Sequence, residues 1–224
     1  MKRIRKKSGL FLLILLIIMT ISIIIVRVIN KQITPIVMKY STSEMKRIVS
    51  VIINRSVNSD ILNKEDMDNL FIISKSNNGE ISSITLDSII VNKITDNISD
   101  ACEDNLRLIE EEKYSEIKKK FNIGEEYFFV PSGIIFNNNL LNRLGPKIPI
   151  AMKMIGNVTS GIKTEVKEYG INNSLITISV EIKVEIMVVL PFSSDYISIS
   201  NDVPFVIKLI QGKVPQLYSG NLIN

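Results

Sequence analysis

The stretch that decides the fold is ITISVEIKVEIMVVL, residues 176–190. Every even position from Ile176 to Leu190 is apolar. The odd positions begin with polar residues, namely Thr177, Ser179, Glu181, Lys183 and Glu185. A period of two predicts a strand with one buried face and one solvated face. At about 3.3 Å per residue this strand would run about 50 Å, far beyond the usual five or six residues.

The same alternation continues on both sides of this strand. In residues 150–166 it is interrupted by Gly156 and Gly161, which predict bulges or bends. In residues 197–209 Pro204 has the opposite parity, which indicates an edge strand or a bulge. Two polar turns separate the three segments, at 168–175 and 191–195. Three long strands joined by short turns predict an antiparallel meander.

Two longer segments upstream have apolar residues at helical spacing. The first covers 36–57, with Pro35 near its start, and the second covers 88–120. Asp87 can cap the second helix and Gly124 can stop it. The shorter elements expected are a hairpin from 69–74 and 81–86 with a turn at Asn77–Gly79, a polar loop at 63–69, a strand at 125–131, and a loop with one or two helical turns at 132–146.

The energetics of the central strand require a cover for its dry face. Eight buried aliphatic side chains contribute about 12–24 kcal/mol, whereas ordering fifteen residues of backbone costs about 15–30 kcal/mol. The two amphipathic helices are the available covers. We therefore predict an α+β fold, with an N-terminal transmembrane helix and an extracytoplasmic domain of amphipathic helices packed on an antiparallel sheet of long C-terminal strands. The expected regions are 1–31, 32–130 and 131–224, the last continuous with the one before it.

The N-terminus predicts the membrane helix. Residues 8–26 carry no charge and are almost entirely apolar, which is long enough to span a bilayer core of about 30 Å. The predicted anchor residues are Leu10, Phe11, Leu15, Ile18, Ile23 and Val26. The basic residues that set the topology are Lys2, Arg3, Arg5, Lys6 and Lys7, which should stay cytoplasmic and leave the rest of the chain outside. A cleavable signal peptide is the alternative, but no alanine precedes Ala101 and no small pair follows the apolar run.

The charge balance argues against nucleic-acid binding. Of the 27 basic residues, seven lie in 1–31, so residues 32–224 have 20 basic against 23 acidic residues and a net charge of −3. The basic character of the chain therefore belongs to its N-terminal tail. Nucleic-acid binding needs a basic face, and the exported part shows no concentrated one.

The residue types also argue against catalysis, cofactors and bound metals. Histidine is absent, which removes the commonest general base and metal ligand. Cys102 is the only cysteine, and no histidine is present to activate it as a nucleophile. We therefore expect it to be a small buried hydrophobic residue. A Ser–Lys dyad has no convincing motif, and Asp66 and Asp68 lack the glycine and glutamate of a calcium loop. Three carboxylate pairs are candidates for glycoside hydrolysis by identity only, namely Glu125/Glu126, Glu165/Glu168 and Glu181/Glu185.

The last third of the chain resembles the sporulation protein YunB family of endospore-forming Firmicutes. The resemblance is carried by GPKIPI (145–150), YGINN (169–173), LPF (190–192), VP (203–204) and QGKVPQLY (211–218). The anchor and the helix after it fit the family's layout, whereas 58–125 matches in layout more than in letters. The resemblance implies a membrane protein made in the mother cell during spore formation. It brings no catalytic residues, since the matching letters are shape determinants of turns and strands.

The expected function is therefore non-enzymatic. We expect an anchored protein of the cell membrane, in sporulating cells the mother-cell or outer forespore membrane, whose domain binds other envelope or sporulation proteins in the space between the two forespore membranes. The order helix, strand, strand, helix, strand across 36–130 resembles ring-building modules and suggests a homo-oligomer. Two alternatives remain open: an envelope enzyme acting on peptidoglycan, and a carrier of lipid or small molecules.

Overall fold

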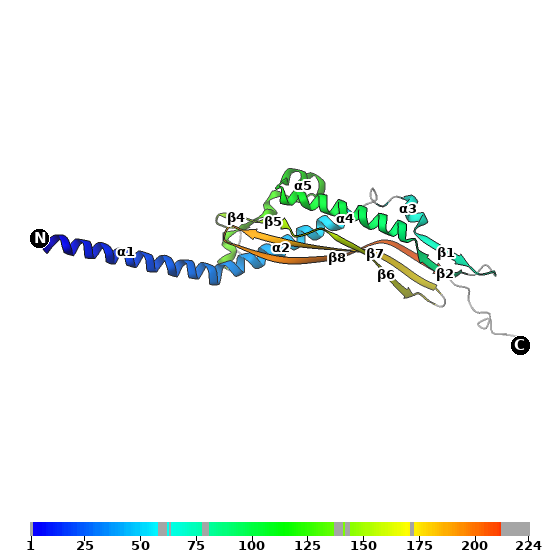
Figure 1. Cartoon of the computed structure of the whole chain (residues 1–224), viewed down its shortest axis with the longest axis horizontal. Helices are drawn as coiled ribbons and strands as arrows, with labels where there is room; N and C mark the ends of the chain where they lie inside the picture. The colour runs from blue at the N-terminus through cyan, green and yellow to red at the C-terminus, as the bar shows by residue number, and fades with distance from the viewer. Residues whose placement is uncertain are drawn as a thin grey trace. The chain divides into compact units, whose positions relative to one another are not determined.

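A computed structural model describes residues 2–57, 62, 64–77, 81–136, 141, 144–170 and 173–211. The helices are α1 (Lys2–Val28), α2 (Thr34–Ser56), α3 (Lys64–Asn69), α4 (Ser88–Glu110) and α5 (Tyr114–Phe121), with a π-helical turn η1 (Ile29–Ile33) and 3₁₀ turns η2 (Glu125–Phe128) and η3 (Ser132–Phe136). The strands are β1 (Phe71–Lys75), β2 (Ile81–Leu86), β3 (Phe129–Pro131), β4 (Lys147–Pro149), β5 (Ala151–Met154), β6 (Thr159–Glu168), β7 (Asn173–Leu190) and β8 (Ser193–Gln211) (Figure 1).

The chain divides into two compact units. The first comprises Met1–Met45, Glu126–Ala151 and Val188–Asp195, and the second comprises Lys46–Glu125, Met152–Met187 and Tyr196–Asn224. The α+β class is confirmed, with a long apolar N-terminal helix and antiparallel sheets of C-terminal strands.

Strand β7 is the centre of the main sheet and pairs with β5, β6 and β8. It pairs with β6 in an antiparallel register, from Thr159 opposite Lys183 to Glu168 opposite Ser174. Strand β8 follows β7 after a two-residue turn, so the end of β8 runs back toward the start of β7. The predicted meander of three long strands is confirmed (Figure 1).

The burial of β7 follows its sequence pattern. Every even residue from Ile178 to Leu190 is buried, whereas Lys183 and Glu185 are exposed. Ile176, predicted to be the first buried position, is only half-buried. The alternation therefore identified the dry face correctly but placed its first buried residue two positions too early.

The predictions for the two glycines upstream of β7 have different outcomes. Gly156 has a φ of +72° and lies in the break between β5 and β6, which confirms the predicted interruption. Gly161 pairs directly opposite Glu181 without a register shift, so the bulge predicted there is wrong. Because only four residues join β5 to β6, both strands lie on the same edge of β7, and β8 takes the other edge. The predicted edge position of Pro204 is thus confirmed for the described strands.

In the second unit α4 packs against β6. The Ser160 hydroxyl donates to the Thr95 carbonyl oxygen over 3.0 Å, and the Ser99 hydroxyl donates to the Ser160 hydroxyl over 2.7 Å. The buried residues of α4 recur mostly every three or four positions, namely Ile94, Thr95, Ile98, Cys102, Asn105, Leu106 and Ile109. One side of α4 thus lies in the core of the second unit.

The single helix predicted at 88–120 is wrong in its last third, where the structure has a break followed by a second helix. Asp87 caps α4 as predicted, since its side chain accepts hydrogen bonds from the Ile89 and Ile90 amides. The helix then ends at Glu110, because Glu112 takes a left-handed φ of 55°. Three consecutive glutamates at a helix C-terminus oppose the helix dipole. The next helix, α5, ends at Phe121 and is capped by Asn122 in the left-handed conformation, two residues before the predicted stop at Gly124.

The shorter predictions are confirmed in part. Strands β1 and β2 form the expected antiparallel hairpin, although Asn78 and Gly79 of its turn lie outside the described residues. The segment 125–131 begins as the 3₁₀ turn η2 and becomes a strand only at Phe129, so the strand predicted for all of it is wrong in its first half. The polar loop predicted at 63–69 is wrong as well, since 64–69 form α3.

Candidate interaction surface

Two of the candidate carboxylates, Glu165 and Glu181, are paired with lysines on the solvated face of the sheet. Glu181 lies 3.0 Å from the Lys183 ammonium and accepts from the Ser200 hydroxyl over 3.3 Å. Glu165 lies 3.2 Å from the Lys167 ammonium. All four charged side chains are at least 36% exposed, and exposed ion pairs contribute about 0–1 kcal/mol. These residues form a solvated surface.

A lysine also pairs with Asp66, one of the two aspartates considered as a possible cation site. The Lys93 ammonium lies 2.9 Å from Asp66, whose side chain is 12% exposed. This pair joins α3 to α4, while Asp68 is exposed. Within the described part of the chain, no group of three or more histidine, cysteine, aspartate or glutamate side chains could hold a metal ion.

Cys102 lies in a buried polar cluster of the second unit. The Asn105 amide donates to the Ser56 hydroxyl over 2.7 Å and accepts from the Lys120 ammonium over 2.6 Å. Burial raises the pKa of the Cys102 thiol to about 11, and a hydrogen bond with Ser56 lowers it in part. The thiolate needed for nucleophilic attack is therefore disfavoured. The cluster joins α2, α4 and α5 and serves their packing.

The sheet of the second unit leaves part of its dry face uncovered. We call the set of Val166, Ile176, Ile207 and Leu209 the uncovered face. Val166 pairs with Ile176, two residues from the buried Ile178. In β8 the alternation changes phase at Phe205 and Val206, which are both half-buried; after them 208 and 210 are half-buried, whereas Ile207 and Leu209 are exposed. Val166 and Ile176 therefore point to the side that is buried elsewhere, and Ile207 and Leu209 are exposed apolar residues at the same end of the sheet.

The exposed fractions show where the helical cover ends. Ile178 and Ile182 are 0% exposed, whereas Val166 is 61%, Ile207 is 67% and Leu209 is 42% exposed. The hydrogen bonds described between α2 and β8 are at Asn201, whose amide donates to the Asn54 side chain over 3.3 Å. Sequence alternation assigned all these residues to the dry face and led to the expectation that they are buried. For Val166, Ile207 and Leu209 that expectation is wrong.

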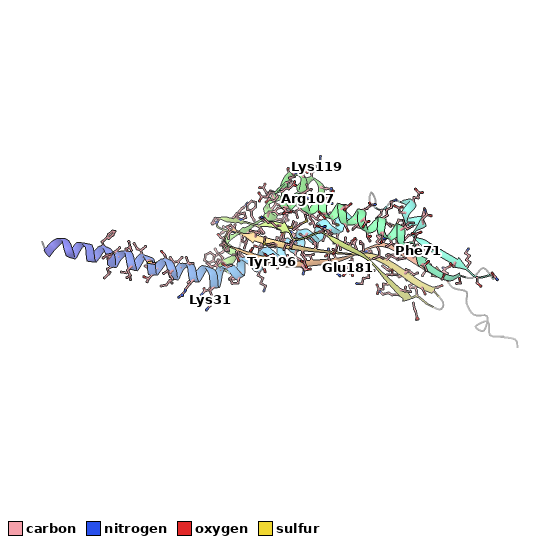
Figure 2. The ribbon with its side chains drawn as sticks, in the orientation of Figure 1. Lys31, Phe71, Arg107, Lys119, Glu181 and Tyr196 are labelled. Atoms are coloured by element: carbon pink, nitrogen blue, oxygen red, sulfur yellow. The ribbon has the colours of Figure 1, made fainter. Side chains whose placement is uncertain are left out.

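A hollow borders the end of β8. It measures about 360 Å³ and is lined by Met67, Asp68, Phe71 and residues 205–208. The Lys208 ammonium lies 4.4 Å from the centre of the Phe71 ring, a cation–π contact. Ile72 and Ile73 of β1 are also exposed. Figure 2 shows Phe71 on β1 and Glu181 on the sheet, in the second unit.

The predicted anchor residues lie on α1. Leu10, Phe11, Leu15, Ile18, Ile23 and Val26 are each at least 47% exposed. By length and composition this is the one helix among the described residues that could cross a membrane, with a mean hydropathy of 3.1 in its most apolar window. The side chains of Lys2, Arg3, Arg5, Lys6 and Lys7 lie outside the described part. Their role in topology, like that of the anchor residues, stays a prediction.

The fold and the surface define a class, an α+β protein with an apolar N-terminal helix that suggests a membrane anchor. The family model described as "Sporulation protein YunB (Spo_YunB)" matches residues 127–217. The chain is 33% identical over 194 residues to the sporulation protein YunB of Bacillus subtilis (strain 168). The aligned region covers 86% of this chain and 74% of that protein. The chain therefore belongs to the sporulation protein YunB family, and the resemblance seen in its sequence is confirmed. No solved structure matches the chain.

Proposed function

We propose that the chain is a single-pass membrane protein required for endospore formation, with its N-terminus cytoplasmic and its other residues in the forespore intermembrane space. It acts there by binding other envelope or sporulation proteins, or further copies of itself, and it catalyses no reaction. The observation that carries this proposal is the uncovered face, where Val166 is 61% exposed on the side of the sheet that is dry elsewhere and Ile207, at the same end of the sheet, is 67% exposed.

The physical argument rests on the cost of exposed aliphatic surface. Fully burying one exposed aliphatic side chain contributes about 1.5–3 kcal/mol, and the three most exposed members are only 61%, 67% and 42% exposed. Covering them would therefore contribute about 3–5 kcal/mol before the costs of association. Contiguous apolar surface on a soluble face marks a binding site more often than single exposed residues do. The charged side chains of the opposite face keep that side solvated.

The membrane orientation follows from charge. Five basic residues precede the apolar stretch of α1, and they are Lys2, Arg3, Arg5, Lys6 and Lys7. Basic residues are retained on the cytoplasmic side, and after α1 the charge of the chain becomes slightly negative. This asymmetry supports export of everything after α1.

Two substitutions on opposite faces of the sheet test the proposal. Val166 of β6 is 61% exposed and pairs with Ile176 of the dry face, whereas Tyr196 of β8 is 68% exposed and has the opposite parity to the buried Ile199 nearby. In a sporulating strain whose own copy is replaced, Val166→Asp should lower the yield of heat-resistant spores, and Tyr196→Asp should not. A thiol introduced by Ile207→Cys should crosslink to protein partners that mass spectrometry identifies, whereas the buried Cys102 stays unreactive.

Opposite results would contradict the proposal. Equal spore yields for the two aspartate variants, with both proteins present at normal levels, would show that the uncovered face binds nothing needed for sporulation. Loss of sporulation on replacing one exported Asp or Glu by alanine, with the fold intact, would instead favour an envelope enzyme. Lipid co-purified with the chain and released by Val166→Asp would favour a carrier.

A further inference from the structure

A second group of exposed apolar residues lies in the first unit, on segments that converge on the start of α2. Phe136 is 68%, Leu144 58%, Ile36 42% and Phe192 40% exposed. We call these four residues the apolar collar. None of them belongs to the apolar stretch of α1 or to the uncovered face, so they need an explanation of their own.

Three contacts bring the collar together. Ile134 of η3 lines a hollow of about 500 Å³ with Ile36 and Tyr40 of α2, which places η3, and Phe136 at its end, beside that helix. The Gly133 amide donates to the Leu144 carbonyl oxygen over 2.8 Å. A Cβ on Gly133 would overlap the Leu144 carbonyl oxygen, so this close approach requires glycine.

The turn between β7 and β8 joins the same place. Ser193, Ser194 and Asp195 line a hollow of about 540 Å³ with residues that include Thr34 and Pro35, at the N-terminus of α2. Phe192 immediately precedes these residues, in the two-residue turn. Its ring is therefore at the turn, near the start of α2.

The helix gives the distance of these residues from the membrane. α2 continues from α1 through η1, and at about 1.5 Å per residue Thr34 lies roughly 9 Å beyond Val28, the end of α1. The headgroup layer on each side of the hydrocarbon core is about 5–8 Å thick. Residues seated around Thr34 and Pro35 are therefore at the outer boundary of that layer, where a Phe or Leu side chain can reach into it.

We propose that the apolar collar inserts into the interfacial layer of the bilayer that α1 crosses. Aromatic and aliphatic side chains are favoured at this depth, and lysines beside them meet lipid phosphates. Lys31 and Lys39 are both exposed, and Lys39 lines both hollows of this region. The collar would fix the first unit against the membrane surface instead of letting it swing on a single helix. The occupant is the lipid surface, because α2, which carries Ile36 and lines both hollows, is continuous through η1 with α1, the helix proposed to cross the bilayer.

Depth measurements on the full-length chain test this proposal. The chain is reconstituted in vesicles of phosphatidylethanolamine and phosphatidylglycerol, and an environment-sensitive fluorophore is attached to Phe136→Cys or Phe192→Cys. The native Cys102 remains, because it is buried and labels poorly. Lys46→Cys is the matched control, since Lys46 is exposed on α2, lines neither hollow of the collar and lies about 27 Å beyond Val28 along the helix.

The expected result is a blue-shifted emission at both collar positions, with stronger quenching by nitroxides near the lipid headgroups than by nitroxides deep in the acyl chains. At position 46 neither lipid-borne nitroxide should quench, and a water-soluble quencher should. Collar probes that behave like the probe at position 46 would overturn the proposal. So would probes shielded from water but untouched by both lipid nitroxides, which would show that protein covers the collar. Spore yields of the uncovered-face variants do not enter this measurement, so the two proposals fail separately.

Discussion

Replacing Ile182 by alanine should loosen the second unit in a way that the native cysteine reports. Ile182 is 0% exposed on the dry face of β7, and it pairs with Ser160 of β6. Ser160 in turn is bonded to α4, the helix that carries Cys102. Truncating a buried isoleucine to alanine costs about 2–5 kcal/mol, from lost transfer energy and the cavity left behind.

This cost converts into a labelling rate. A tenfold change in an opening equilibrium corresponds to about 1.4 kcal/mol, so the open population should rise between about 30-fold and 4,000-fold. The assay is the rate at which a thiol reagent modifies Cys102 in the full chain, at fixed pH and in detergent. Cys102 is the only cysteine of the chain and is buried, so the reagent reports opening of this core.

Lys183→Ala is the matched control on the adjacent residue. Its side chain is 55% exposed and pairs with Glu181 over 3.0 Å, an interaction that contributes about 0–1 kcal/mol. Its labelling rate should rise about fivefold at most. If Ile182→Ala raised the rate no more than Lys183→Ala does, the dry face of β7 would not hold α4 in place, and the account of the core given above would be wrong.

Two further predictions concern the buried polar cluster. Asn105→Ala removes the hydrogen bonds to Ser56 and Lys120 and should lower the free energy of unfolding by about 1–3 kcal/mol; a denaturant midpoint unchanged from that of the parent would refute this. Because burial raises the pKa of Cys102 from 9.0 to about 11, the folded state holds its proton more tightly, so stability should fall as pH rises from about 9 to 11. Cys102→Ala should flatten that part of the pH profile, and an equal slope in both proteins would contradict it.

Sequence predicted best what depends on local chemistry. The period of two in β7 is a property of consecutive residues, and the structure keeps it from Ile178 to Leu190. Asp87 caps α4 for the same reason, since a cap needs only its own side chain and the next few amides. The break at Glu112 could not be predicted from spacing, because the residues after it return to an apolar helical pattern.

What the sequence missed is the extent of the cover. Alternation shows which side of a strand is apolar but does not show what packs against it. Comparing the length of the covering helix with the length of the strand would have shown that the cover is incomplete. The 23 residues of α2, the helix bonded to β8 at Asn201, span about 35 Å, whereas the 19 residues of β8 span about 60 Å. A helix cannot cover the whole face of a strand so much longer than itself, and the exposed Ile207 and Leu209 lie at the end of β8.

A membrane anchor would compensate for the weak binding that the uncovered face can provide by itself. A surface whose burial contributes about 3–5 kcal/mol is weak once the cost of association is subtracted, and free in solution it would bind only transiently. Confinement to one membrane strengthens such binding, because tethering replaces bulk concentration by an effective concentration that can reach the millimolar range. A tethered protein therefore needs little apolar surface to assemble. Moving the same chain off the membrane, by replacing α1 with a soluble fusion partner, should therefore abolish the Ile207→Cys crosslinks at unchanged protein level. Crosslinks of undiminished yield would show that the uncovered face binds tightly by itself.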